Sequence, residues 1–159
     1  MKASANNRPQ KLRMTSSGFT LIELMVTIAV LAIIVGIAAP SISTQLANQR
    51  VKSTASTLEN ALKEAKAESI IRRQDLTFTY NNNGTNVGVI SVANVSSYSY
   101  SAKSTITDSE SKNTITFKPS KRVDSIIYTI CDSNKSVKSR QIEVSKIANI
   151  TNKLGGTCP

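Results

Sequence analysis

A long apolar segment near the amino terminus predicts the first element. From Phe19 to Ala39 the side chains are predominantly apolar, and Glu23 is the only charged residue. At about 1.5 Å of rise per residue, a helix of this length matches the roughly 30 Å hydrocarbon core of a bilayer. The apolar core of a cleaved secretory signal is shorter, about 7–15 residues. Residues 19–40 are therefore predicted to form a membrane-spanning helix.

A second helical pattern follows, with a different distribution of polar residues. We expect an amphipathic helix over 41–73, ending near Arg72 or Arg73, because two cations suit the negative end of a helix. A coiled-coil seam is the alternative, but the apolar stripe lasts less than three heptads, so packing on a folded head is favoured. The stripe comprises Val51, Ala55, Leu58, Leu62, Ala65 and Ser69 or Ile70. Acid–base pairs four residues apart lie on the exposed side: Glu59–Lys63 and Glu68–Arg72.

From Asp75 onward the period changes to two, which is typical of β-strands. The Ser-rich stretch 96–111 is either a weak strand or a long loop, and 147–151 is a candidate for a short final strand. The clearer strands are predicted at 75–80, 87–93, 113–118, 123–131 and 139–145. The chain is thus predicted to be α+β, with a long N-terminal helix packed on a small antiparallel sheet or sandwich that forms a head over 74–159.

The formal net charge of the 159-residue chain is +10, and its distribution predicts an orientation. A basic flank without acids stays in the cytoplasm, so everything after Pro40 is predicted to lie outside it. The surplus of +6 that remains (16 basic against 10 acidic residues) is interpreted as a solvated surface. The flank before the span contains Lys2, Arg8, Lys11 and Arg13.

Glu23 is the residue that a plain signal anchor does not explain. Thr20 and Glu23 fit a capping box, in which a hydroxyl and a carboxylate three residues apart satisfy the first amides of a helix. A cap contributes about 1 kcal/mol, whereas a charge inside a span costs about 2.5–3.5 kcal/mol on insertion scales. The cap alone does not offset this cost, which indicates a functional role for the acid.

The sequence GFTLIE, residues 18–23, resembles the class III signal of type IV pilins and type II secretion pseudopilins. The resemblance implies that a prepilin peptidase removes residues 1–18 as a leader by cutting after Gly18, and that the new amino terminus, Phe19, is methylated. It also implies that Glu23 pairs with the amino terminus of a neighbouring subunit in a filament, which would make a buried acid tolerable.

Gly36 and Pro40 extend this resemblance. Proline inside a helix removes one hydrogen bond and clashes with the preceding turn. In this class of protein, the stretch between such a glycine and proline can loosen when the subunit leaves the membrane for the filament. A simple kink at the membrane edge is equally compatible with the sequence.

The two cysteines, Cys131 and Cys158, both lie in the region placed outside the cytoplasm, where a disulfide can persist. A bridge between them would close a loop of about 27 residues and contribute roughly 3.5 kcal/mol in the chain-entropy model. A metal site or a catalytic thiol has no support, because the chain contains no histidine and two cysteines are an incomplete zinc shell.

The same lack of histidine excludes Ser–His and Cys–His catalysis. The acids of the head show no paired spacing, and no Gly-rich phosphate loop is present. We therefore expect a protein that acts by assembly rather than by catalysis, with no cofactor and no metal.

The run from Val51 to Tyr80 and the later segment ICDSNKSVKSRQIEVS resemble the GspH/FimT family, and within it the FimU-type minor pilins. Pseudopilin H of type II secretion is a relative of the same fold. The resemblance implies a single-pass protein of the inner membrane of a Gram-negative bacterium, with its head in the periplasm, which later reaches the pilus and the cell surface. The implied partners are other minor and major pilins or pseudopilins, the prepilin peptidase and the inner-membrane assembly platform.

Two functions of different class follow from this resemblance. The first is a structural subunit of a tip complex that primes pilus assembly. The second is a FimT-type DNA receptor for natural transformation, which needs clustered cations against phosphates. The DNA-binding members carry a Gly-Arg-x-Arg motif near the carboxyl terminus, and the corresponding stretch here contains no arginine, which favours the structural role. Candidate DNA contacts are Lys135, Lys138 and Arg140, with Lys146 and Lys153 as further cations.

Overall fold

The computed structural model describes residues 18–159, apart from the side chains of 38–40. The leader expected over 1–18 therefore lies outside the described residues except for Gly18, and so does the Pro40 side chain. The chain divides into two units, Met1–Ala38 and Ala39–Pro159. The helix α1 (Leu21–Arg72) belongs to both units, and all strands belong to the second, which we call the head.

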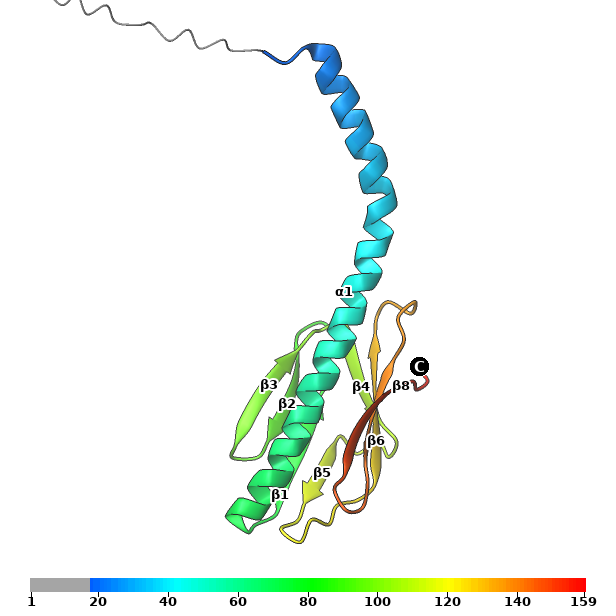
Figure 1. Cartoon of the computed structure of the whole chain (residues 1–159). Coiled ribbons are helices and arrows are strands. Elements are labelled where there is room, and N and C mark those ends of the chain that lie inside the picture. The colour runs from blue at the N-terminus through cyan, green and yellow to red at the C-terminus, as the bar shows by residue number, and fades with distance from the viewer. Residues whose placement is uncertain (1–17) are drawn as a thin grey trace, which may run out of the picture. The chain divides into compact units, whose positions relative to one another are not determined.

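The head contains eight strands in two antiparallel sheets of four (Figure 1). The first sheet has the order β3-β2-β1-β5 and the second the order β4-β6-β7-β8. The chain crosses from one sheet to the other between β3 and β4, between β4 and β5, and between β5 and β6. The strands are β1 (Leu76–Asn81), β2 (Gly88–Val92), β3 (Ser96–Tyr100), β4 (Ser104–Asp108), β5 (Thr114–Phe117), β6 (Ile126–Asp132), β7 (Arg140–Val144) and β8 (Ile150–Leu154).

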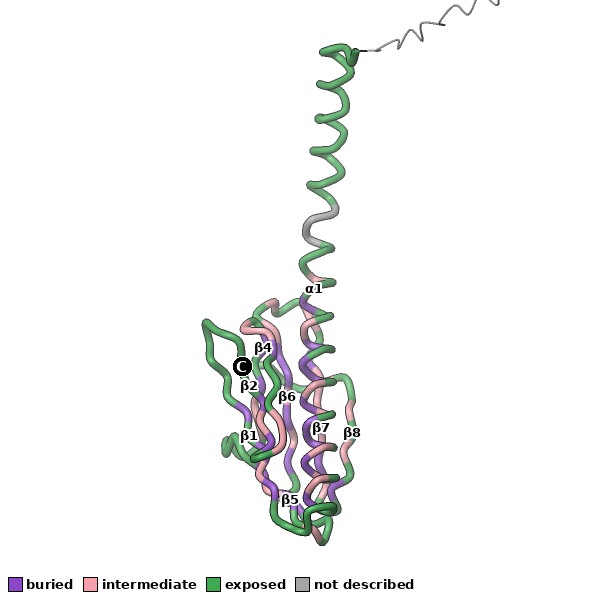
Figure 2. The backbone as a smooth tube through the Cα atoms, turned by 90° about the vertical axis from the view of Figure 1, so that its left-hand side faces the viewer, coloured by how far each residue is buried: buried purple, intermediate pink, exposed green. Residues whose placement is uncertain are grey.

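One core joins α1 to both sheets. The stripe of α1 that faces the strands is buried and its other face is exposed, as Figure 2 shows. Phe78 and Tyr80 of β1 meet Tyr128 of β6 edge to face, with ring centroids 5.9 Å apart in both pairs. The predicted stripe is confirmed, with Ser69 buried and Ile70 36% exposed. The residues of α1 in this core are Val51, Ala55, Leu58, Ala61, Leu62 and Ala65, and Ala47, Thr54 and Ser69 are also buried.

The end of α1 also agrees with the sequence. The helix stops at Arg72, and Arg73 adopts a left-handed conformation with φ of 54°. The amide of Gln74 then donates to the carbonyl of Ser69 at 3.3 Å, which is the bond that closes a Schellman motif. This turn sends the chain directly into β1.

Two strand predictions need correction. The Ser-rich stretch is neither one weak strand nor a loop, because it forms β3 and β4, which are edge strands of different sheets. The final strand is not at 147–151. It begins at Ile150, because 145–149 form a turn in which Ala148 has a positive φ of 55° and its amide donates to the carbonyl of Ser145.

Candidate functional site

The amino-terminal segment begins with a capped helix. Thr20 precedes α1, and its Oγ1 accepts a hydrogen bond from the backbone amide of Glu23 at 3.3 Å. The carbonyl of Thr20 accepts from the amide of Leu24 at 3.2 Å. The threonine half of the predicted capping box is therefore present. The Glu23 side chain is exposed, which leaves its carboxylate open to a partner from outside the chain.

The helix that follows is apolar on all sides and covered on none. Every large apolar side chain from Phe19 to Ile37 is at least half exposed, from 50% at Val30 to 80% at Phe19. A helix with apolar residues all round its axis is stable only when lipid or protein covers it. A side chain at Gly36 would meet nothing within 4 Å, so packing within the chain does not require glycine there.

Whether the apolar part of α1 has the length and composition of a membrane span depends on where the helix is divided. When α1 is divided between Ile37 and Ser41, no single helix in the described part of the chain is long and apolar enough to cross a membrane. The segments Leu21–Ile37 and Ser41–Arg72 meet this condition together, by length and composition only.

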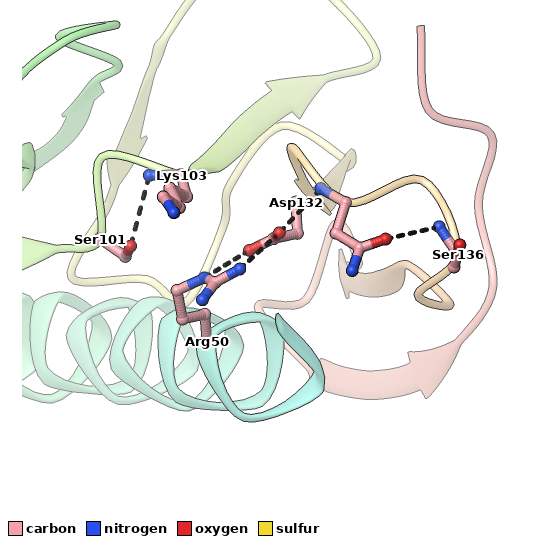
Figure 3. A network of polar contacts seen from close by, with 6 residues as sticks. Arg50, Ser101, Lys103, Asp132 and Ser136 are labelled. Carbon is pink, nitrogen blue, oxygen red and sulfur yellow. Dashed lines mark hydrogen bonds and ion pairs between the residues drawn. The ribbon is translucent and has the colours of Figure 1, made fainter. Parts of the chain in front are cut away.

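Within the head, an ion pair joins Arg50, in the middle of α1, to the end of β6 (Figure 3). The Nε of Arg50 donates to Oδ2 of Asp132 at 2.8 Å, and Nη2 donates to Oδ1 at 2.9 Å. The amide of Asn134 also donates to Oδ1, at 2.9 Å. The Asp132 side chain is fully buried, and burial alone would raise its pKa, but the bonds from Arg50 and Asn134 outweigh burial and hold the pKa below its usual value.

Further along α1, acidic side chains bind the strands on either side. Glu64 accepts hydrogen bonds from Ser96 and Tyr98 of β3 at 2.6 and 2.9 Å. Glu59 accepts from Asn152 of β8 at 2.9 Å and also pairs with Lys63. Each sheet therefore contributes an edge strand that is bonded directly to α1.

The carboxyl-terminal tail is tied down by the predicted disulfide. Cys131 on β6 and Cys158 are joined, with their Cα atoms 5.9 Å apart. The hydroxyl of buried Ser139 shares its single proton between the carbonyls of Gly155 and Gly156, at 3.1 and 2.6 Å. The tail therefore crosses sheet β4-β6-β7-β8 between two fixed points, the Ser139 bonds and the disulfide.

Close packing of the tail also explains one glycine. A Cβ atom at Gly156 would lie 2.8 Å from Thr129 and 2.9 Å from Gln141, and the φ of Gly156 is 105°. Any larger residue would have to push the tail away from the sheet. Glycine at position 156 therefore allows the tail to pack closely against the sheet.

The predicted DNA contacts lie beside this tail. Lys138 and Arg140 line a hollow of about 530 Å³ together with Lys52 of α1, which we call the helix hollow. Among the described residues that line it there is no carboxylate. Lys135 lies beside Lys138 in a second hollow of about 800 Å³ next to the disulfide, which we call the tail hollow.

The other two cations considered for DNA do not join this group. Lys153 pairs with Glu143 at 3.0 Å. Lys146 lies near the other end of the head. This follows from Ala148, two residues further along the same loop, whose carbonyl accepts a hydrogen bond from Lys66 of α1. Lys66 is 14 residues beyond Lys52, which is about 21 Å along a helix. The five cations therefore do not form one surface.

Within residues 18–159, no group of three or more His, Cys, Asp or Glu side chains is placed to hold a metal ion. The polar residues that organise the head, Arg50, Glu64 and Asp132, were not singled out from the sequence as a connected set. Their partners lie tens of residues away in the chain, so no local pattern marks them.

Comparison with known proteins agrees with both parts of the chain. Residues 13–39 match the family described as the prokaryotic N-terminal methylation motif. Two crystal structures of the type IV minor pilin FimU of Pseudomonas aeruginosa (strain PAO1), in different crystal forms, are similar to the chain. One is 17% identical with a TM-score of 0.57 and covers 68% of this chain and 99% of that chain. The other is 17% identical with a TM-score of 0.59 and covers 70% and 96%.

No curated protein matches the sequence. At 17% identity the structural likeness shows the fold, and the predicted α+β class, a long helix packed on antiparallel sheets, is confirmed as pilin-like. The chain thus matches the prokaryotic N-terminal methylation motif at its amino terminus and is similar in fold to a type IV minor pilin.

Proposed function

We propose that the chain is a structural minor pilin of the GspH/FimT type that is processed, anchored in the inner membrane and then built into a type IV pilus. One observation carries the proposal: the methylation motif contains a helical segment, up to Ile37, whose large apolar side chains are all exposed, ahead of a head that buries its own core. A subunit stored in a membrane and used in a filament needs both parts, because lipid and then neighbouring helices cover the same apolar surface.

In this proposal the prepilin peptidase cuts between Gly18 and Phe19 and methylates Phe19. The exposed carboxylate of Glu23 then pairs with the amino terminus of a neighbouring subunit. The stretch between Gly36 and Pro40 gives way when the helix leaves the membrane. The head belongs to a tip complex with other minor pilins, which primes assembly by the major pilin on the inner-membrane platform.

Replacement of Glu23 by alanine tests the assembly role. The variant loses a charge from the apolar helix, so membrane insertion should be equal or slightly better. Its amount in sheared surface filaments should fall strongly, because the neighbouring amino terminus would lose its counter-charge. Glu110→Ala, which removes an exposed carboxylate from the head, is the control and should enter filaments normally. Equal incorporation of both variants would contradict the pairing role.

Deletion of the gene separates pilus assembly from type II secretion. Loss of surface filaments and of the motility that depends on them supports the pilus subunit. Intact filaments with loss of secreted enzymes would instead assign the chain to the secretion machine, as a pseudopilin H. A pull-down with residues 45–159, which are most of the head, should recover other minor-pilin heads in the first case. This fragment keeps the core, because no described side chain before Ala47 is buried.

The helix hollow favours DNA binding as a second candidate function, since Lys52, Lys138 and Arg140 line it without a carboxylate. A mobility shift of duplex DNA by the head tests this, at low salt and at about 150 mM salt, because phosphate contacts weaken steeply with salt. Micromolar binding at the higher salt, lost when Lys135, Lys138 and Arg140 are changed together to Gln, would favour the DNA receptor. The control changes three cations that form ion pairs, Lys63, Lys112 and Lys153.

A further inference from the structure

A third hollow lies at the end of the head where α1 stops. It has a volume of about 590 Å³ and is formed by the loop after β5 and the loop between β7 and β8. Phe117, the last residue of β5, is paired with Leu76, which follows the end of α1 by four residues. We call it the basic hollow. Its lining residues are Thr116, Lys118, Arg122, Val123, Asp124, Lys146 and Ile147.

Backbone hydrogen bonds fix the positions of its three cations. The amide of Lys118 donates to the carbonyl of Arg122 at 3.1 Å, and the amide of Lys121 donates to the carbonyl of Lys118 at 2.9 Å. The amide of Val123 donates to the carbonyl of Lys146 at 3.3 Å, which joins the two loops. Lys118, Arg122 and Lys146 therefore stand on backbone segments that are bound to each other.

The described residues balance the charge of this hollow only in part. Among the described residues, the ion pairs lie elsewhere, and none includes Lys118, Lys121, Arg122 or Lys146. Asp124 is the one carboxylate among the described residues that line the hollow. Three cations against one carboxylate give the lining a surplus of positive charge, which attracts an anion.

We propose that the basic hollow binds a phosphate group. The forked guanidinium of Arg122 and the ammonium groups of Lys118 and Lys146 are the donors that phosphate oxygens prefer. Ile147, which is 74% exposed, and Val123 offer an apolar wall to whatever carries the phosphate. A long DNA strand fits less well, because the carboxylate of Asp124 interrupts the positive surface of this hollow, whereas the helix hollow has no carboxylate among its described lining residues. The phosphate comes either from a free polyphosphate or from a lipid headgroup.

Titration of the oxidised head, residues 45–159, with inorganic tripolyphosphate at about 150 mM salt tests the site. The wild-type head should bind, and Lys118→Gln with Arg122→Gln should weaken binding by about tenfold or more, because two charge-assisted hydrogen bonds are lost. The control with the same loss of charge, Lys135→Gln with Lys138→Gln at the tail hollow, should change binding by less than about twofold. The four side chains are exposed, so both variants should keep the wild-type melting temperature.

Absence of binding by the wild-type head would overturn the proposal, and so would an equal loss in the two double variants. Vesicles of phosphatidylcholine with phosphatidic acid separate the sources. If the wild-type head sediments with these vesicles but not with vesicles of phosphatidylcholine alone, and the double variant Lys118→Gln with Arg122→Gln does not sediment, the phosphate belongs to a lipid. Binding of tripolyphosphate alone assigns it to a free phosphate. A further outcome is that the head binds duplex DNA more tightly than tripolyphosphate and loses this binding equally in both double variants. That result would show a general attraction for polyanions and would contradict a specific phosphate site.

Discussion

Arg50 and Asp132 are separated by 82 residues in the sequence, yet they form a bidentate ion pair with hydrogen bonds of 2.8 and 2.9 Å. The carboxylate is fully buried and the guanidinium side chain is 25% exposed. The pair joins α1 to β6 one residue after Cys131, so the helix, the sheet and the tail disulfide meet at one place. This junction sets the position of the tail relative to the first helical turns of the head.

Loss of Arg50 should destabilise the head, because it leaves a buried carboxylate without its charged partner. Arg50→Gln should lower the free energy of unfolding by about 2–3 kcal/mol, somewhat less than for a fully buried pair because Arg50 is partly exposed. The control is Lys63→Gln, which breaks an exposed pair with Glu59 and should cost no more than about 0.5 kcal/mol. Urea unfolding of the oxidised head measures both. Equal effects of the two variants would contradict the role given to Arg50.

The same pair predicts a dependence of stability on pH. The pKa of Asp132 in the folded head lies below its value in the unfolded chain, which is about 3.9. Its contribution is therefore complete above that unfolded value and is lost as the pH falls through the folded pKa. The pKa of Asp108 is also lowered: burial raises it, but bonds from the amides of Asn113, Glu110 and Lys112 and from the Tyr80 hydroxyl outweigh burial.

The head should accordingly lose stability as the pH falls through the unfolded pKa of about 3.9 toward the lower pKa values of the folded carboxyl groups. Asp132→Asn should be less stable than wild type at pH 7. The gap should narrow in acid, because the unfolded wild-type chain then binds a proton at Asp132 that the folded head binds less readily. Urea unfolding at pH 7 and pH 3 measures the difference. A gap that stays constant or widens in acid would show that Asp132 does not carry this pH dependence.

The disulfide should stabilise the folded head, because its cysteines are 27 residues apart and the bridge restricts the unfolded chain. Replacing Cys131 and Cys158 together with alanine should cost about 3.5 kcal/mol in the chain-entropy model. Reduced wild-type head should unfold at the same urea concentration as the double variant, since both lack the cross-link. If the double variant is as stable as the oxidised wild type, the tail does not need the bridge.

Gly156 offers a test of how closely the tail packs. Gly155→Ala and Gly156→Ala both place a side chain at a positive φ, of 131° and 105° respectively. A Cβ at Gly155 meets nothing within 4 Å, whereas one at Gly156 collides with Thr129 and Gln141. Gly156→Ala should therefore be the less stable of the two by about 1–3 kcal/mol, the range for overpacking. Equal stability of the two variants in urea unfolding would indicate that the tail is not held against the sheet.

The elements of this fold that rest on local pattern could be predicted from the sequence. The stripe on α1 identified its buried face, and alternation located β1, β2, β5, β6 and β7 to within a few residues. The pairing of the cysteines followed from their number and compartment. In each case the determinant is a periodicity or a count that the sequence displays directly.

The Ser-rich stretch shows where local pattern is insufficient. Serine has little preference for strands, so Ser96–Tyr100 carries a weak signal. Tertiary contacts fix β3 instead: Ser96 and Tyr98 bond to Glu64, and Tyr100 packs over Gly88, where a Cβ would lie 2.1 Å from its ring. Such partners cannot be identified until the fold is known, and the same holds for Arg50 with Asp132 and for the loops of the basic hollow.

The central claim is that this chain is a processed subunit of a surface filament. Intact-mass analysis of filaments sheared from cells that contain an active prepilin peptidase tests it most directly. The account predicts a mature chain that begins at Phe19, carries one added methyl group and retains the Cys131–Cys158 bridge. A chain that still begins at Met1, or one that is found in the membrane and never in filaments, would contradict it.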